Sequence, residues 1–203
     1  MSLRKLIGAG GACCAAVVLA ACGTGDSQPS GPSGTPSTAA VSMRVTVEPA
    51  PHQPARAGIT VEHDPCFSVP DSVPEGLGFA PLSRERNDYV FDDYAFIGCE
   101  FERLEKSRFS DQMRRVGSMT VWSSGITLDE VRAKRFEGSQ DTTVRSRPAV
   151  SYTSKSASAC YIAMDGPDGV IQIRISNSPE TDWRACDHIR EAAEAVEATL
   201  PDK

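Results

Sequence analysis

The most reactive side chains of this chain are its seven cysteines. Four of them lie well inside the sequence, at Cys66, Cys99, Cys160 and Cys186. None of the spacings between them is of the C-x-x-C type that zinc sites use, and the chain has three histidines in all. We therefore expect no metal site. In an oxidising compartment an even set of four cysteines predicts two disulfides, with three possible connectivities.

Cys22 differs from these four because it ends an apolar run. Two basic residues precede a segment of apolar and small residues, 6–21, which contains no acidic residue and is too short to span a bilayer. The segment ends in Leu19-Ala20-Ala21-Cys22, which resembles the bacterial lipobox, where a diacylglycerol is attached to the thiol and the preceding peptide is removed. We therefore expect a signal peptide over residues 1–21 and lipid attachment at Cys22. An ordinary or uncleaved signal with a chance cysteine is the alternative.

A lipid anchor of this kind predicts where the protein is held and what it contacts. Acyl chains hold a protein on a membrane without spanning it, so the expected location is the extracytoplasmic face of the cell membrane. Once Arg4 and Lys5 leave with the signal peptide, 27 acidic and 19 basic residues remain, a formal net charge of −8. This acidity argues against nucleic acid as a partner and against electrostatic adhesion to anionic lipid, because both would repel the chain.

Composition divides the rest of the chain into a tether and one domain. Over residues 23–40, 16 of the 18 residues are Gly, Ser, Thr, Pro or Ala, a composition that cannot bury enough apolar surface to fold. Prolines continue beyond this segment. We therefore expect a flexible tether over residues 22–60 and a single extracytoplasmic domain over residues 61–203, although the alternating residues 43–47 are compatible with an edge strand.

Period-two alternation of apolar residues predicts the strands of the domain. It occurs over residues 95–101, 116–122, 142–152, 160–164 and 170–175, and Pro148 interrupts the third of these segments. The last two segments flank five turn-forming residues and therefore predict a β-hairpin. Its inward face consists of Cys160, Ile162, Met164, Ile171, Ile173 and Ile175. The stretch from Ser83 to Asp93 is polar and predicts a loop.

Three segments carry helix signals. Residues 182–200 place apolar side chains at spacings of three and four, which predicts an amphipathic helix ending before Pro201. Thr127 and Glu130 form a capping box, and Asp64-Pro65-Cys66 begins another short helix. The predicted fold is therefore α+β. It has an antiparallel sheet of about five to six strands, a C-terminal helix packed on one face and two shorter helices, and it is stapled by two disulfides.

Strand direction favours one of the three disulfide connectivities. A hairpin returns the chain to where it began, so the helix that follows brings Cys186 back to Cys160 at the start of the first hairpin strand. Cys66 and Cys99 then form the other pair. A register slip of one residue would turn Cys160 to the other face of the sheet, so this pairing depends on the register.

The sequence predicts no catalytic residue and no cofactor. Outside the predicted signal peptide, where Ser2 and Lys5 match S-x-x-K by chance, it contains no G-x-S-x-G elbow, no S-x-x-K, no H-E-x-x-H and no Walker-type loop. A few polar residues invite a chemical interpretation: the acidic loop of Asp88, Asp92 and Asp93, the turn residues Asp165 and Asp168, the helical pair His188 and Glu191, and His63. For each of them, a solvated loop, a turn or an exposed helix face is a simpler interpretation than a site for calcium or another metal.

Several short sequence motifs, taken in their order along the chain, make this sequence resemble the actinobacterial lipoproteins grouped as domain of unknown function 3558. The motifs are the lipobox, Asp64-Pro65-Cys66, Gly98-Cys99-Glu100-Phe101, Pro148-Ala149, Cys160, and Cys186 on a final helix ending in Leu200-Pro201. The family often has tryptophan where this chain has Phe101, and glycine where it has Arg147. The resemblance implies a cell-envelope lipoprotein with two disulfides, and it implies no particular activity.

Two classes of function follow from these observations. The first is a non-catalytic binding or interaction module of the cell envelope, anchored in the plasma membrane and facing a protein, glycan or lipid partner. The alternative is an envelope-acting hydrolase or a carrier of lipid or another small ligand. Two carboxylates about 5–9 Å apart in a pocket would favour the hydrolase, and a dry apolar cavity between sheet and helix would favour the carrier.

Overall fold

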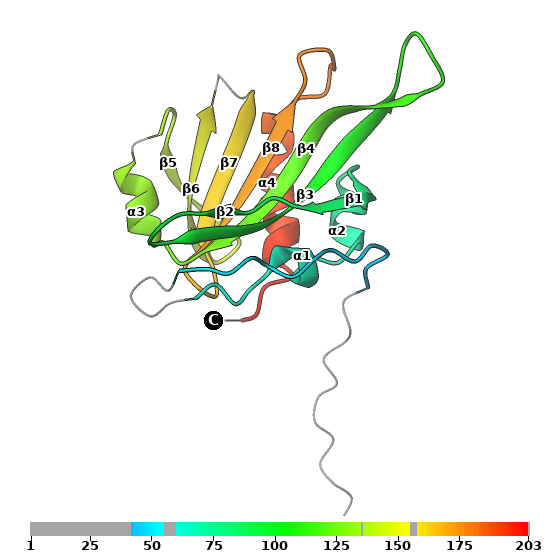
Figure 1. Ribbon diagram of the computed structural model, residues 1–203. Coiled ribbons are helices and arrows are strands. Elements are labelled where there is room, and N and C mark those ends of the chain that lie inside the picture. Colours follow the sequence, from blue (N-terminus) through cyan, green and yellow to red (C-terminus); the bar gives the residue numbers. More distant parts are fainter. Residues whose placement is uncertain (1–41, 55–59, 135, 155–157, 203) are drawn as a thin grey trace, which may run out of the picture. The chain divides into compact units, whose positions relative to one another are not determined.

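The computed structural model describes residues 42–54, 60–134, 136–154 and 158–202. The predicted signal peptide, the predicted lipid attachment site Cys22 and the first part of the predicted tether lie outside these residues. The described strands form one antiparallel sheet with the order β1-β3-β4-β8-β7-β6-β5, and β2 pairs with β3 beside this path (Figure 1). Their bounds are β1 Ala80–Arg86, β2 Tyr89–Val90, β3 Ala95–Lys106, β4 Met113–Ser124, β5 Gln140–Val144, β6 Arg147–Ser154, β7 Ala159–Asp165 and β8 Val170–Asn177.

The sheet has eight strands, which is more than the five to six predicted from the sequence. The additional strands are β1 and β2, which occupy most of the polar stretch 83–93, so the prediction of a loop there was wrong. Pairing with the edge of β3 makes these polar residues extended. In the segment 142–152 the chain turns at residues 145–146, and Pro148 lies inside β6 opposite Thr143 of the edge strand β5.

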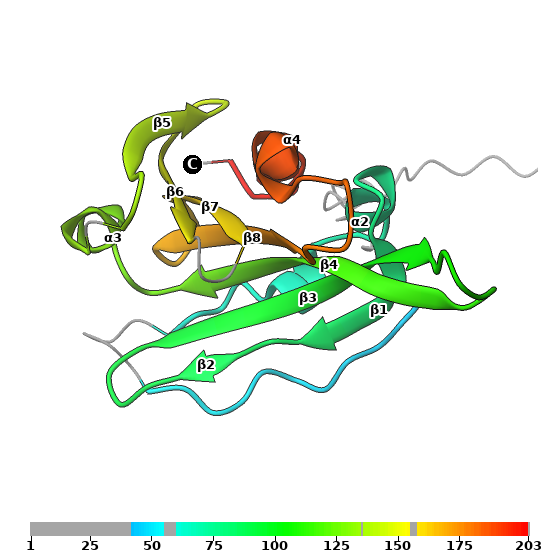
Figure 2. The same ribbon diagram turned by 90° about the horizontal axis from the view of Figure 1, so that it is seen from above.

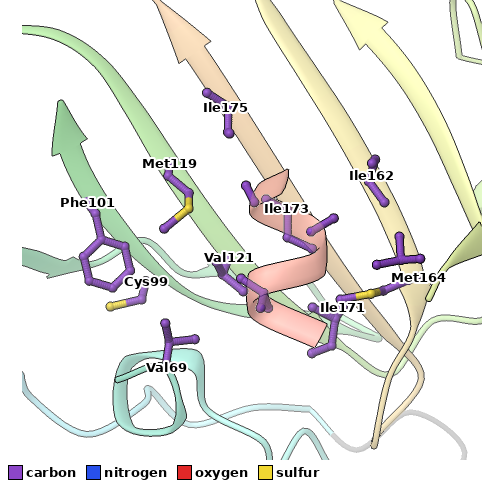
Figure 3. Close-up of a cluster of buried hydrophobic side chains, with 14 of the residues drawn as sticks. Val69, Cys99, Phe101, Met119, Val121, Ile162, Met164, Ile171, Ile173 and Ile175 are labelled. Atoms are coloured by element: carbon purple, nitrogen blue, oxygen red, sulfur yellow. The ribbon is translucent and has the colours of Figure 1, made fainter. Parts of the chain in front are cut away.

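The predicted hairpin and the C-terminal helix are both confirmed. β7 and β8 pair with Ile162 opposite Ile173, and helix α4, Ala185–Glu197, packs across one face of these strands (Figure 2). The inward residues predicted for the hairpin are all buried, and five of the six belong to the main hydrophobic core. Figure 3 shows the five that belong to the core together with Val69, Cys99, Phe101, Met119 and Val121. The main core therefore lies between the sheet and α4.

The short helices number three rather than two among the described residues. The segment after Asp64 forms two pieces, α1 over Pro65–Ser68 and α2 over Ser72–Gly76, where the sequence had predicted one. Pro70 lies between them, and it lacks the amide hydrogen that a continuous helix would use. The third helix, α3 over Leu128–Ala133, begins with the predicted capping box. None of the helices in the described part of the chain is long and apolar enough to cross a bilayer.

The structure confirms both predicted disulfides. Cys66 of α1 is bonded to Cys99 of β3, with Cα atoms 4.8 Å apart. Cys160 of β7 is bonded to Cys186 in the first turn of α4, with Cα atoms 5.2 Å apart. Each disulfide joins a helix to the sheet at a different end of the core, so the two together hold the helical layer on the sheet.

A buried ion pair fastens the N-terminal segments to the same core. The guanidinium of Arg84 donates hydrogen bonds to the carbonyl oxygens of Cys66 and Val69, each at 2.9 Å, and to the Asp71 carboxylate at 2.7 Å. Burial opposes ionisation of Asp71, but hydrogen bonds from Arg84 and Arg44 outweigh it and lower the pKa of this carboxyl group. Arg84 therefore replaces the missing backbone partners of α1 and holds α2.

The later part of the predicted tether contacts the domain. The amide of Arg44 donates to Asp71 at 2.7 Å, and the Val47 side chain packs against the main core. Gln53 exchanges two hydrogen bonds with the backbone of Val61. Ordered contacts thus begin about twenty residues before the predicted boundary at residue 61. No strand forms over residues 43–47, so these contacts come from side chains and isolated backbone groups.

The disulfide between Cys160 and Cys186 generates a stability prediction. It closes a loop with a sequence separation of 26, so replacing both cysteines, as Cys160→Ser with Cys186→Ser, should lower the free energy of unfolding by about 3.5 kcal/mol on the chain-entropy estimate. Urea unfolding followed by circular dichroism measures this. The control is non-reducing peptide mapping, which should still find Cys66 joined to Cys99. An unchanged unfolding midpoint would contradict the structural role of this disulfide.

Candidate functional site

The face of the sheet opposite α4 carries an unusual set of aromatic side chains. In strands, successive side chains point to opposite faces, so residues that alternate with the core must point away from it. Trp122 of β4 follows the core residue Val121, and Gln172 of β8 lies between Ile171 and Ile173. The same alternation turns Phe96 of β3, Tyr161 of β7 and Tyr152 of β6 toward this outer face.

Three adjoining hollows, with volumes of about 300, 400 and 620 Å³, open on this outer face. All three are lined by Phe96 and Gln172, so they form one continuous groove. We call it the aromatic groove and define it by Phe96, Trp122, Phe136, Tyr152, Tyr161 and Gln172. It begins beside α3 and crosses β6, β7 and β8 toward the β2–β3 hairpin.

One wall of the aromatic groove is a column of parallel rings. The Phe136 ring stacks on Tyr152 with centroids 4.3 Å apart, and Tyr152 stacks on Tyr161 with centroids 4.8 Å apart. Tyr152 and Tyr161 lie directly opposite each other on neighbouring strands, which is why their rings can stack. Phe136 comes from the segment after α3 and remains 41% exposed, so the end of the column faces solvent.

The phenol of Tyr152 fixes the orientation of Gln172. Its hydroxyl donates a hydrogen bond to Gln172 Oε1 at 2.7 Å. Burial, with a smaller contribution from Tyr161, raises the pKa of Tyr152, so the phenol stays protonated and remains a donor at physiological pH. Because Oε1 of Gln172 is the acceptor, the amide nitrogen points to the other side. Among the described residues, that nitrogen has no hydrogen-bond partner.

The opposite wall depends on a glycine. The Trp122 ring lies across the backbone of Gly98, and its Nε1 donates to the carbonyl oxygen of Asn87 at 2.6 Å. A Cβ atom at position 98 would lie 2.6 Å from Trp122 Nε1 and 2.8 Å from the Asn87 oxygen, closer than real Cβ atoms approach such neighbours. Tyr89 packs against Trp122 with ring centroids 6.0 Å apart. Only glycine at position 98 leaves room for this arrangement.

A polar row borders the groove on β3, β4 and β8. The register places Glu100, Thr120 and Arg174 side by side on the outer face. Glu100 is buried and accepts hydrogen bonds from Asn87 at 2.7 Å and Thr120 at 3.1 Å, and it pairs with Arg115. The Glu100 carboxylate is therefore fully engaged. Arg174 lines the groove, and within the described residues its guanidinium has no ion-pair partner.

One of the carboxylates at the α3 end of the groove is also bound into the structure. Glu130 lines the smallest hollow, and its Oε2 accepts hydrogen bonds from the amide and the hydroxyl of Thr127, at 2.7 and 3.0 Å. This is the capping box of α3, so the Glu130 side chain holds the helix end. Asp93 lines the same hollow from the loop before β3. The groove therefore offers ring faces and polar hydrogen-bonding groups, with one of its carboxylates committed to the capping box.

The polar residues noted in the sequence are dispersed rather than gathered at one site. Asp88 accepts from Arg86 at 2.6 and 2.8 Å and from the Gly98 amide. The Asp168 side chain points out of the β7–β8 turn, and its carboxylate accepts hydrogen bonds from the backbone amides of Glu62 and His63, at 2.9 and 2.7 Å. His188 lies 3.5 Å from Glu191 on α4. Where the structure describes side chains, no three His, Cys, Asp or Glu residues converge as a metal site would require.

Sequence reasoning missed the aromatic groove, although a signal for it was present. The alternation that predicted inward residues also turned Phe96 to the other face of its strand, and Tyr161 alternates with Cys160 and Ile162. A half-buried strand is expected to show polar residues on its outer face. Aromatic residues at outer positions of several strands indicate an apolar patch on that face, and such patches mark binding surfaces.

A comparison with models of protein families gives one result for this chain. The model of a family described as a protein of unknown function (DUF3558) matches residues 17–199. The match covers every described helix and strand. The chain matches no curated protein and no solved structure.

The contact between Gly98 and Trp122 generates a prediction. Gly98→Ala should displace the Trp122 ring and lower the free energy of unfolding by about 1–3 kcal/mol, because the ring is held by its bond to Asn87 and cannot give way freely. Urea unfolding measures the loss, and tryptophan fluorescence reports the displaced ring. The matched control is Gly76→Ala, where an added Cβ atom meets nothing within 4 Å. Equal effects of the two substitutions would contradict the prediction.

His63 generates a pH prediction. Burial lowers the pKa of His63 below its ordinary value of 6.5, and the carboxylates of Asp168 and Asp64 oppose this shift without reversing it. The unfolded chain therefore binds this proton more readily, and the stability linked to His63 is lost as pH falls below about 6.5. Relative to His63→Gln, the wild-type protein should lose free energy of unfolding between pH 7.5 and pH 5.

Thermal unfolding at several pH values measures this difference. The matched control is His52→Gln, which removes an exposed histidine and shows whether the loss of any histidine changes the profile. A difference between wild type and His63→Gln that stays constant with pH would show that His63 is not the group responsible.

Proposed function

We propose that this chain, which belongs to the DUF3558 family, is a membrane-anchored extracytoplasmic lipoprotein whose domain binds a partner in the aromatic groove without catalysing a reaction. The observation that carries the binding function is the continuous groove on the outer face of the sheet, lined by aromatic rings and by Gln172. Aromatic side chains with a few fixed polar groups are the usual lining of binding sites.

The sequence supports the anchor. Residues 1–21 have the layout of a secretory signal, and Leu19-Ala20-Ala21-Cys22 resembles the lipobox, so Cys22 is the proposed site of lipid attachment. The two disulfides are compatible with an oxidising, extracytoplasmic compartment. The contacts of residues 42–54 with the domain leave about twenty residues, 22–41, between the lipid and the first ordered contact.

The residues that line the groove, and its position on the outer face of the sheet, favour a binding module over a hydrolase or a lipid carrier. A glycosidase needs two carboxylates that both reach the scissile bond, whereas of Asp93 and Glu130 in the smallest hollow the Glu130 carboxylate is held in the capping box by Thr127. A lipid carrier needs a dry apolar cavity, whereas the three hollows lie on the outer face of the sheet and are partly polar. The space between the sheet and α4 is filled by core side chains (Figure 3).

Photo-crosslinking in the cells that make the protein tests this proposal. Benzoylphenylalanine in place of Phe136, at the exposed end of the ring column, should form a covalent adduct with the bound partner. Phe109 is the matched position, because it is 98% exposed in the loop between β3 and β4 and lies outside the groove. The adduct should appear from position 136 and not from position 109, as judged by mass spectrometry.

The same crosslinking experiment also tests the proposed lipid anchor at Cys22. With Cys22→Ala, the protein should lack acyl label and keep its signal peptide, and the adduct at position 136 should decrease because the domain no longer reaches its working location. Equal adducts at both positions would contradict binding in the groove. An acylated and processed Cys22→Ala protein would contradict the anchor.

A further inference from the structure

We infer that the ligand of the aromatic groove is a neutral glycan chain, which lies along the ring column and is held by Gln172 and Arg174. This inference rests on the proposed binding function and names the chemical class of the partner. It is drawn from the kind of apolar surface in the groove, the polar groups beside it and the charge around it.

The apolar surface of the groove consists mainly of flat rings. Five of its six defining residues are aromatic, and the stacked rings of Phe136, Tyr152 and Tyr161 are parallel to within 14°. A sugar ring has an apolar face of C–H groups, whose positive hydrogens are attracted to the negative face of an aromatic ring. Because Phe136 and Tyr161 cover the faces of Tyr152, the ring faces that the column offers a sugar are those of Phe136 and Tyr161 at its two ends.

The polar groups of the groove suit hydroxyl groups. A sugar hydroxyl both donates and accepts hydrogen bonds, so it can use the free amide hydrogens of Gln172, whose orientation is fixed by Tyr152. The guanidinium of Arg174 lines the same hollow as Trp122 and Tyr161, and it supplies further donors. An acyl chain would leave all these groups without hydrogen-bond partners, at a cost in binding free energy.

The charge around the groove favours a neutral ligand. Its charged lining residues are of both signs, namely Asp93, Glu130, Lys134, Glu137 and Arg174. Single-stranded nucleic acid also stacks on aromatic rings, but it requires a positively charged groove, and this chain is acidic. A neutral glycan has no net charge for this mixed surface to repel.

The position of the groove disfavours an extended peptide. A peptide that adds to a sheet binds along an exposed edge, where unpaired backbone groups accept it. The groove instead lies over β6, β7, β8 and β4, and each of these strands is paired on both sides. Three connected hollows on such a surface provide side-chain contacts to successive units of a chain, which suits a repeating glycan.

A fluorescence titration tests the inference. The chain has two tryptophans, and Trp183→Phe leaves Trp122 of the groove as the single indole reporter. The ligands are neutral hexasaccharides of N-acetylglucosamine, glucose, mannose, galactose and arabinose, added one at a time up to about 10 mM, which exceeds a Kd in the millimolar range. At least one hexasaccharide should change the Trp122 emission in a saturable way.

Three variants in this background locate the binding. Phe136→Ala should weaken it by about tenfold or more, because the exposed end of the ring column is lost. Gln172→Leu keeps the side-chain volume but removes the amide, so it should also weaken glycan binding. An acyl chain or an apolar peptide would bind this variant as tightly as it binds the parent. Phe109→Ala, the matched control outside the groove, should leave the affinity unchanged. Thermal unfolding confirms that each variant is folded.

The outcomes separate this inference from the function on which it rests. If no hexasaccharide binds, or if Phe136→Ala and Gln172→Leu bind as tightly as the parent, the glycan inference is overturned. If at the same time crosslinking at position 136 captures a protein, the groove is still a binding site and only its ligand class was wrong. If neither experiment detects a ligand, both proposals fall.

Discussion

The register of the central antiparallel strands is the constraint on which both faces of this domain depend. Ile173 of β8 lies opposite Ile162 on one side and opposite Val121 on the other, and all three side chains face α4. Because successive side chains alternate, the same register turns Trp122 and Tyr161 to the outer face. A shift of one residue would exchange the two sets. The core and the strand residues of the aromatic groove are therefore two consequences of one strand pairing.

The segment Gly98–Phe101 shows how this alternation lets four residues serve two faces. Gly98 leaves room for the Trp122 ring, and Glu100 accepts the buried hydrogen bonds of the polar row. The two residues that point inward do different work: Cys99 forms a disulfide with α1, and Phe101 packs in the core under the guanidinium of Arg84, 4.9 Å from its ring centre. The segment carries part of the family resemblance, and the structure gives each of its residues a physical role.

Arg147, which stands where the family often has glycine, holds the end of α4. It donates to the Glu197 carboxylate at 3.1 Å and to the carbonyl oxygen of Pro201 at 2.6 Å. Together with the disulfide at the start of α4, this contact fixes the helix at both ends on the sheet. Because the sheet is held in this way, the strands that carry the groove have little conformational freedom before binding. A ligand would therefore bind at a small cost in conformational entropy of the protein.

The sequence by itself determined the parts of this protein that depend on neighbours along the chain. Alternation over residues 160–175 and the apolar stripe over 182–200 predicted the hairpin, the final helix and, through strand direction, both disulfides. The tertiary structure alone decided the rest. Most of the polar stretch 83–93 became strands because the edge of β3 paired with it and the carboxylate of Asp71 accepted a hydrogen bond from Arg84. The groove arose because rings from separate segments, on four strands and after α3, came side by side. Local periodicity is written in consecutive residues, whereas pairing between distant segments depends on which groups meet in space.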